Sequence, residues 1–269
     1  MTARTDTIRL WPARAYRDTF APQAPEPAEG AELPPGWHGL YFLPDLALDA
    51  LRPDGTPARD GVVPDIDLPR RLFAGEEMTF HRPIRFGERL DLTVTLEQLK
   101  EKEGRSGRLV FVTIAKTVGD AVTVRQHDVF LGPTGPALPG PGPGDLDWEE
   151  PLDLGPIHLF RYSALTYNSH LIHYNDPWTR EVEQQPGLLV HGPLTSMLLL
   201  DFALRRNPGR VPATYSMRAV APVHLGAPVR LAGRPEGGGA RMWVLDASGG
   251  VLVSAEITFG SQVPGAGVA

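Results

Sequence analysis

Two stretches of the chain alternate hydrophobic and polar residues, and each stretch predicts an antiparallel β-meander. The first covers residues 78–132 and the second covers residues 215–260. In both, a Pro-x-x-x-Gly element (residues 83–87 and 222–226) precedes a strand, a glycine-bearing turn, a second strand, a tight turn and a last strand. Because the order of the elements and the positions of the turns coincide, we interpret the two stretches as related halves of one chain.

A third pattern, the almost unbroken apolar run of residues 193–206, predicts a helix without a polar face. It begins at Pro193, whose missing N–H costs nothing at a first helical position, and it ends just before an Asn-Pro-Gly sequence. Such a helix must be enclosed, and we expect a sheet wrapped around it. The equivalent stretch of the first half, residues 36–47, is interrupted by Pro44, so we expect that half to be degenerate.

Proline and glycine alternate along residues 132–145 (GPTGPALPGPGPGD), where neither a helix nor a strand ladder can persist. A length of 269 residues suits one large domain or two small ones. We therefore predict a degenerate N-terminal half over residues 1–131, a linker over residues 132–147 and a catalytic C-terminal half over residues 148–269.

The composition narrows the classes of function. A net charge of −6 argues against a nucleic-acid partner or an anionic membrane surface. Cysteine is absent from the sequence, which excludes disulfides, thiolate nucleophiles and thiolate metal sites. The first residues lack the apolar segment of a signal peptide, and no apolar run is long enough to span a bilayer, so we expect a soluble, cytoplasmic protein with no membrane partner.

The residue types that transfer protons gather in one segment, residues 160–202. It contains His170, His173 and His191 together with tyrosines and asparagines, and the apolar helix begins there at Gly192. The N-terminus of a helix carries free N–H donors and the positive end of the helix dipole. The segment therefore combines acid–base groups with a place where a developing oxyanion can be stabilised.

Several segments resemble a known family. VHGPLTSMLLL resembles the start of the central helix in MaoC-like enoyl-thioester hydratases, where a His-Gly pair opens that helix. RYSALTYNSHLIHYN and PGLLVHGPL resemble more closely the branch that contains mesaconyl-C4-CoA hydratase and the mitochondrial type 2 3-hydroxyacyl-thioester dehydratase. LPRRLFAGEEMTFHRPIRFGERL resembles the degenerate N-terminal half of mesaconyl-C4-CoA hydratases. The resemblance implies an α+β double hotdog, in which two antiparallel sheets each wrap a central helix and form a pseudo-dimer.

The resemblance departs from the family at one important position. The common hydratase signature is Asp-x-Asn-Pro-x-His, in which Asp and His flank the reactive water. Residues 168–173 read NSHLIH here, so the final histidine, His173, is retained and Asn168 replaces the aspartate. An amide can hold a water molecule but cannot accept its proton at neutral pH.

The resemblance implies three catalytic residues: His173, Asn168 and Gly192. His173 would be the acid/base, because an imidazole titrates near neutrality. Asn168 would orient the water or the substrate hydroxyl, and the N–H of Gly192 would receive the thioester oxygen. The sequence leaves plainer roles open for each: a loop histidine packed on the helix, a turn-forming asparagine and a tight helix entry.

Four further residues are predicted to contact the substrate: Tyr162, Arg161, His170 and His191. Arg161 would pair with the second carboxylate of a dicarboxylic acyl group, and Arg70 and Arg71 are rival candidates for that role. His170 lies three residues before His173, a spacing that invites a metal interpretation. No carboxylate or other third ligand stands at a sequence spacing typical of metal sites, so we predict no metal site.

The resemblance implies a hydro-lyase that reversibly hydrates an enoyl-CoA thioester, with mesaconyl-C4-CoA to citramalyl-CoA as the preferred reaction. The alternatives are a 3-hydroxyacyl-thioester dehydratase of fatty acid metabolism, a hotdog acyl-CoA thioesterase and a non-catalytic acyl-CoA binding module. We expect no cofactor besides the CoA of the substrate, because the thioester itself acidifies the α-carbon. Two fused hotdog halves mimic the minimal hotdog dimer, and pairing into a homodimer is suggested by analogy alone.

Overall fold

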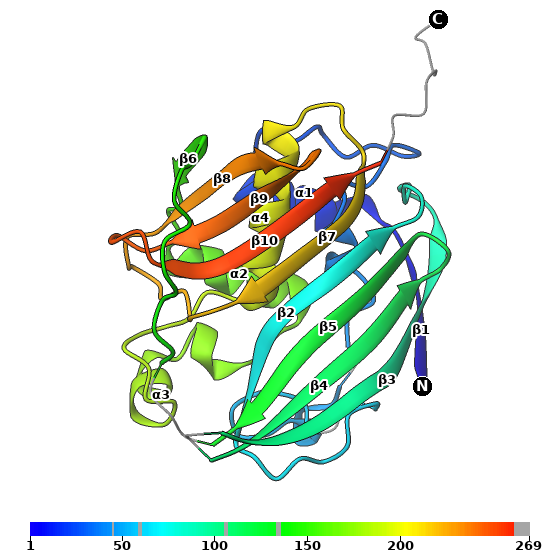
Figure 1. Cartoon of the computed structure of the whole chain (residues 1–269). Coiled ribbons are helices and arrows are strands. Elements are labelled where there is room, and N and C mark those ends of the chain that lie inside the picture. Colours follow the sequence, from blue (N-terminus) through cyan, green and yellow to red (C-terminus); the bar gives the residue numbers. More distant parts are fainter. Residues whose placement is uncertain (45, 59–60, 105–106, 133–135, 261–269) are drawn as a thin grey trace, which may run out of the picture.

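The fold is built on an antiparallel β-sheet (Figure 1). The computed structural model describes residues 1–44, 46–58, 61–104, 107–132 and 136–260, and within them ten strands pair in the order β1-β3-β4-β5-β2-β7-β10-β9-β8-β6. The strands are β1 (Thr2–Thr7), β2 (Arg70–Phe80), β3 (Arg89–Gly104), β4 (Gly107–Val118), β5 (Val122–Leu131), β6 (Trp148–Pro151), β7 (Pro212–Ala219), β8 (Arg230–Glu236), β9 (Gly239–Leu245) and β10 (Val251–Phe259).

The sheet consists of two similar halves joined edge to edge. The order β3-β4-β5-β2 in the first half repeats as β8-β9-β10-β7 in the second half, and β2 pairs with β7, where Met78 lies opposite Tyr215. Each Pro-x-x-x-Gly element ends in a glycine with positive φ, 92° at Gly87 and 80° at Gly226, just before β3 and β8. The predicted repeat is confirmed, and the two expected sheets form one continuous sheet.

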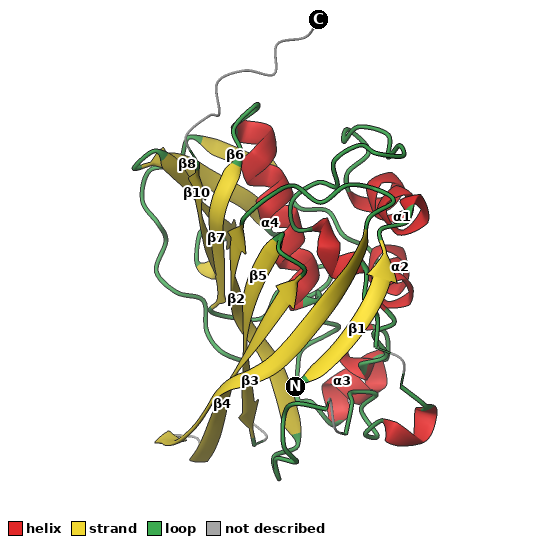
Figure 2. Cartoon of the chain, turned by 90° about the vertical axis from the view of Figure 1, so that its right-hand side faces the viewer, coloured by secondary structure: helices red, strands yellow, loops and turns green. Residues whose placement is uncertain are grey.

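Helix α4 (Gly192–Arg206) is the helix predicted from the apolar run, and it is enclosed. Residues 194–203 are all buried, because the helix contacts β2, β7, β8, β9 and β10. Figure 2 shows the sheet on one side of α4, with α1 (Leu10–Phe20) and α2 (Pro156–Thr166) beyond its other side. The apolar sequence of α4 therefore meets a protein surface in each direction.

Within the described residues, the first half has no helix equivalent to α4. The corresponding stretch forms only η1 (Trp37–Leu40), a 3₁₀ turn of four residues, followed by η2 (Leu48–Ala50). This agrees with the predicted interruption at Pro44 and differs from the expectation that each half of the sheet wraps a central helix. The inner face of the first half is therefore not filled by a helix.

Two short helical elements stand between α2 and α4 in the sequence. They are the 3₁₀ turn η3 (Leu171–His173) and helix α3 (Asp176–Glu181). The side chain of Asn175 accepts a hydrogen bond from the N–H of Trp178 at 3.0 Å, so it caps the N-terminus of α3. None of the helices in the described ranges is long and apolar enough to cross a membrane.

The predicted linker lies partly outside the described residues, at positions 133–135. Its described part, from residue 136 to residue 147, runs along the second half of the sheet. There Gly140 exchanges two backbone hydrogen bonds with Val251, of 2.8 and 2.9 Å. The boundaries predicted for the two halves and the linker stay a prediction.

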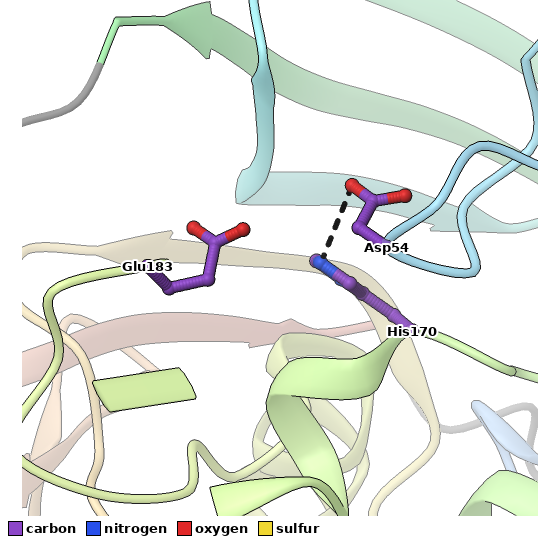
Figure 3. A group of neighbouring side chains, drawn as sticks. All are labelled: Asp54, His170 and Glu183. Atoms are coloured by element: carbon purple, nitrogen blue, oxygen red, sulfur yellow. Dashed lines mark ion pairs between the residues drawn. The ribbon is translucent and has the colours of Figure 1, made fainter. Parts of the chain in front are cut away.

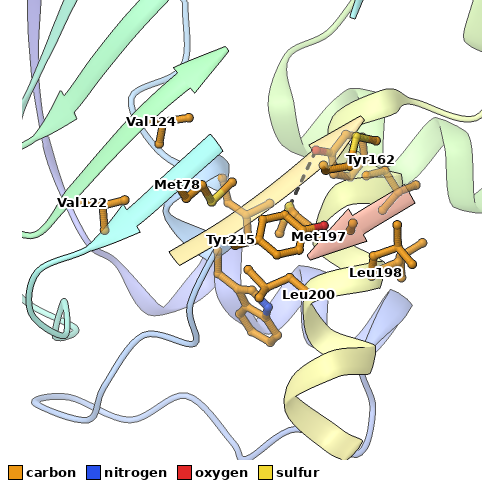
Figure 4. Close-up of a cluster of buried hydrophobic side chains, with 14 of the residues drawn as sticks. Met78, Val122, Val124, Tyr162, Met197, Leu198, Leu200 and Tyr215 are labelled. Carbon is orange, nitrogen blue, oxygen red and sulfur yellow. Dashed lines mark hydrogen bonds between the residues drawn. The ribbon is translucent and has the colours of Figure 1, made fainter. Parts of the chain in front are cut away.

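The hydrophobic core is continuous between the two halves (Figure 4). Met78, Val122 and Val124 of the first half belong to the same cluster as Leu200 and Tyr215 of the second half. Burying apolar surface stabilises by about 25 cal/mol per Å², so a shared core makes the association of the halves part of folding itself.

A buried carboxylate ties the first half to α4. Asp201 of α4 accepts a hydrogen bond from the hydroxyl of Tyr16 in α1 at 3.0 Å and another from Nε1 of Trp37 in η1 at 3.0 Å. Both aromatic residues are at most 1% exposed. Each donor would be left without a partner in the core if the carboxylate were removed.

We predict that Asp201→Ala lowers the free energy of unfolding by about 2–4 kcal/mol, because two buried donors lose their acceptor. Chemical denaturation at pH 7 measures this change. Asp18→Ala is the matched control: the Asp18 side chain is 61% exposed in its ion pair with Arg17, and its loss should change the same free energy by less than about 0.5 kcal/mol. Equal effects of the two substitutions would contradict the structural role of Asp201.

Candidate active site

The loop between α2 and η3 is shaped by Asn168. Helix α2 ends at Tyr167, which has a left-handed conformation (φ 53°), and Oδ1 of Asn168 accepts a hydrogen bond from the N–H of His170 at 3.0 Å. This is a local turn formed by an asparagine side chain. Asn168 also lines the large cavity described below, so the turn-forming role and a substrate-facing position are combined in one residue.

His173 is held in one tautomer. Its Nδ1 donates a hydrogen bond to the carbonyl oxygen of Leu189 at 2.8 Å, because a carbonyl can only accept. The neutral ring therefore carries its lone pair on Nε2. Burial, together with the neighbouring His170, lowers the pKa of His173 to about 3. The ring is thus neutral over the whole physiological range, with an unprotonated Nε2.

The ring of His191 packs against the ring of His173. The two rings stack with their centroids 3.5 Å apart, and Nε2 of His191 lies 2.8 Å from the hydroxyl oxygen of Ser163. His191 is 0% exposed and is not among the residues that line the cavity. Burial lowers its pKa well below the ordinary value. The structure therefore places His191 as a packing partner of His173 and not, as predicted, against the substrate.

Gly192 begins α4 at a point of close approach between the halves. A Cβ at this position would lie 2.5 Å from Cδ1 of Phe73 in β2, which is closer than side chains tolerate. Its N–H belongs to the first turn of α4, where backbone N–H groups have no partner within the helix. The glycine lines the same cavity as His173, so an N–H donor and a proton acceptor share one wall.

A cavity of about 1280 Å³ lies between the inner face of the first half of the sheet and the segment that carries His170 and His173, which we call the histidine loop. It is larger than most small-molecule sites, and its walls are mainly apolar. The residues that line it include Phe73, Tyr162, Asn168, His170, His173 and Gly192. The first half, which has no counterpart of α4 in the described residues, contributes much of this wall through β2, β4 and β5.

A loop of the first half is bound to the histidine loop. The hydroxyl of Ser169 donates to the carbonyl of Gly55 at 2.7 Å, and the N–H of Leu171 donates to the carbonyl of Asp54 at 2.8 Å. Gly55, with φ 83°, passes so close that a Cβ would lie 1.9 Å from the carbonyl oxygen of Ser169. The position of the loop that carries the catalytic candidates therefore depends on both halves.

This contact brings two acidic residues beside His170 (Figure 3). Asp54, His170 and Glu183 offer ligand atoms within 4.8 Å of one another, and Nε2 of His170 is 3.8 Å from Oδ2 of Asp54. Glu183 is already paired with a cation, because Nε of the buried Arg70 lies 2.8 Å from its Oε2. A guanidinium in that position would repel a metal ion, so we assign Glu183 to its ion pair with Arg70.

The structure separates the remaining predicted residues. Tyr162 lies in the cavity wall, buried, with its hydroxyl 3.7 Å from Sδ of Met197. Arg161 is exposed on the opposite face of α2, where it donates to the hydroxyl of Thr19 at 3.0 Å, and it does not line the cavity. The two rival arginines, Arg70 and Arg71, do line the cavity.

The sequence interpretation missed these charged and polar residues that the first half contributes to the cavity: Asp54 beside it, and Glu76, Lys116, Gln126 and Asp128 in its wall. The strand residues had a readable signal. Lys116 stands in phase with the buried positions of an alternating strand, where a hydrophobic residue is expected. Asp54 had no such signal, because it lies in a loop whose position is decided by contacts far along the chain.

Comparison with known proteins places the fold and the family. Residues 36–225 match the family described as hydroxyacyl-thioester dehydratase type 2. The chain is 35% identical over 271 residues to mesaconyl-C(4)-CoA hydratase of Chloroflexus aurantiacus, and the match covers 95% of this chain and 94% of that protein.

Among solved structures, the MaoC-like dehydratase from Phytophthora capsici has a TM-score of 0.68 at 16% identity and covers 98% of this chain and 96% of that one. A Mycobacterium tuberculosis protein described as having a double hotdog fold has a TM-score of 0.56 at 16% identity, covering 96% and 95% of the two chains. The α+β double-hotdog fold predicted from the sequence is confirmed.

The buried histidines predict how stability depends on pH. Burial lowers the pKa of His38 and His170 to about 4 and that of His173 to about 3. Between pH 6.5 and these values the unfolded chain binds protons that the folded chain does not, so stability is full above pH 6.5 and falls toward pH 4 by about 3 kcal/mol per histidine. Asp201, whose pKa burial raises to about 6, acts in the opposite sense over part of this range.

We therefore expect the free energy of unfolding, measured by denaturant titration, to be several kcal/mol lower at pH 4.5 than at pH 7.5. His38→Gln should make this decrease in unfolding free energy smaller by the contribution of one buried histidine. His81→Gln, at an exposed position after β2, should leave it unchanged. An unfolding free energy that does not decrease on acidification would contradict the neutral, buried state assigned to these rings.

Proposed function

Because the chain belongs to the hydroxyacyl-thioester dehydratase type 2 family and is a hydro-lyase of acyl thioesters, we propose that its reaction is the hydration of mesaconyl-C4-CoA to citramalyl-CoA. The observation that carries the proposal is the geometry of His173, which has its lone pair on Nε2 and lines the same cavity as Gly192, the first residue of α4. The identity of 35% with a mesaconyl-C(4)-CoA hydratase over nearly the whole length supports the choice of substrate.

His173 moves the proton in the proposed reaction. Its Nε2 removes a proton from water while the oxygen of that water bonds to the β-carbon of the enoyl thioester. The electron pair of the double bond moves to the thioester oxygen, which gains negative charge. The imidazolium then returns its proton to the α-carbon, so that H and OH have been added and the ring is neutral again. The reverse sequence eliminates water.

Gly192 stabilises the charge that develops on the thioester oxygen. An N–H at the start of α4 is oriented before the reaction, and the helix dipole adds a positive potential at the same place. A donor of this kind is typically worth 10²–10³ in rate. The close contact with Phe73 explains why a residue without a Cβ is needed there.

Asn168 positions the water. Its Oδ1 is engaged by the N–H of His170, so the amide NH₂ is the group that it offers to the cavity. A donor holds the water through its oxygen and leaves a proton free to point toward His173. One base is then sufficient, because the same imidazole takes the proton and returns it. The CoA of the substrate is the only cofactor that this scheme requires.

We expect His173→Ala to reduce kcat at least 10³-fold with mesaconyl-C4-CoA, since no other group takes the proton. The rate is measured as loss of the ultraviolet absorbance of the conjugated thioester. His81→Ala, a substitution of an exposed histidine that does not line the cavity, is the control and should retain full activity.

The same assay separates the alternatives. Loss of absorbance with crotonyl-CoA but not with mesaconyl-C4-CoA would assign the protein to 3-hydroxyacyl-thioester dehydration in fatty acid metabolism. Release of free CoA thiol without hydration would identify a thioesterase. Binding of both thioesters without turnover would identify an acyl-CoA binding module and would reject the proposed reaction.

A further inference from the structure

A row of charged and polar side chains stands on a face of the sheet that is otherwise apolar. On β4, Lys116 shares its face with Val112, Ile114 and Val118, which are all at most 3% exposed. On β5 the same inner face carries Gln126 and Asp128 among valines and a phenylalanine, at positions 122, 124 and 130. Lysine, glutamine and aspartate at such positions cost free energy unless they have partners.

Hydrogen bonds join this row into a chain along the cavity wall. Arg71 donates twice to Oδ2 of Asp128, at 2.9 and 2.7 Å, and so neutralises that carboxylate. The amide nitrogen of Gln126 donates to both oxygens of Asp128, at 2.9 and 3.1 Å. Gln126 is thereby oriented with its Oε1 toward Lys116, whose ammonium donates to it at 2.5 Å. All four residues line the cavity.

The positive charge at the end of the row acts on the interior of the cavity. His38 of η1 is buried in the cavity wall, and its pKa is lowered to about 4 by burial and then by the ammonium of Lys116. Glu76 of β2 lies beside Gln126, and burial raises the pKa of Glu76, while the hydroxyl of Ser196 and the ammonium of Lys116 lower it. A cation on an apolar wall favours an anionic ligand.

The row and the proposed reaction centre line the same cavity. Phe73 of β2 contacts Gly192, and Glu76 follows three residues later on the same strand. Glu76 pairs with Gln126 of β5 in the sheet, and Gln126 binds Lys116 of β4. This chain of contacts connects the start of α4 with the ammonium of Lys116.

We propose that Lys116, oriented by Gln126, binds the free carboxylate of a dicarboxylic enoyl thioester and so determines the substrate class. This inference rests on the proposed function and deepens it. It replaces Arg161, which lies outside the cavity, as the residue that recognises the second carboxylate.

The test compares mesaconyl-C4-CoA with crotonyl-CoA, an enoyl thioester that lacks the free carboxylate, and uses the full-length protein. We expect the unsubstituted protein to prefer mesaconyl-C4-CoA. Lys116→Met should lower kcat/KM for mesaconyl-C4-CoA about 100-fold and change that for crotonyl-CoA less than about threefold, because only the first substrate loses a charged partner. Lys102→Met, a substitution of an exposed lysine on β3, is the matched control and should change neither value.

Glu76→Gln distinguishes carboxylate binding from an internal ion pair. If Lys116 binds substrate, Glu76→Gln should keep the preference for mesaconyl-C4-CoA. Equal losses on both substrates for Lys116→Met and Glu76→Gln, with a lowered Tm for each, would show that the two residues merely stabilise one another and would overturn the inference. Turnover of mesaconyl-C4-CoA that survives Lys116→Met would also overturn it and leave the hydratase function intact. Turnover of neither thioester by the unsubstituted protein would instead reject the proposed function.

Discussion

The enclosure of α4 is the constraint on which the rest of the structure depends. Residues 194–203 of this helix are buried on all sides, so the second half must curl around it and the first half must close the remaining face. Asp201 shows how specific the closure is, because its two oxygens each accept a hydrogen bond from an aromatic residue of the first half. The N-terminus of α4 is thereby fixed at the junction of the halves, where Gly192 touches Phe73.

The asymmetry between the halves creates the site. Both halves repeat the same strand order, but only the second has a long central helix in the described residues, so the first leaves space that becomes cavity. In the proposed reaction, chemistry and recognition are divided accordingly. The second half supplies His173 and the helix N-terminus, and the first half supplies the long wall with Lys116. Under this proposal, the divergence of two related halves separates a reactive end from a selective end.

Burial decides the electrostatics of this arrangement. It keeps His173 neutral, with Nε2 free, because Leu189 fixes the proton on Nδ1. It also makes each charge in the wall dependent on a partner, as in the pairs of Arg71 with Asp128 and of Arg70 with Glu183. The proposed base and the proposed carboxylate-binding cation stand on different elements, His173 in η3 and Lys116 on β4.

The sequence by itself determined the local elements: the two meanders, the helix of residues 193–206, its glycine entry and the candidate His173, since periodicity and capping act over short ranges. It misplaced Arg161 and His191, because the direction of a side chain from a helix or loop depends on what packs around it. Only the tertiary structure brought Asp54 beside His170 and set Lys116 on the cavity wall. Those positions follow from contacts between residues far apart in the chain, which no local pattern encodes.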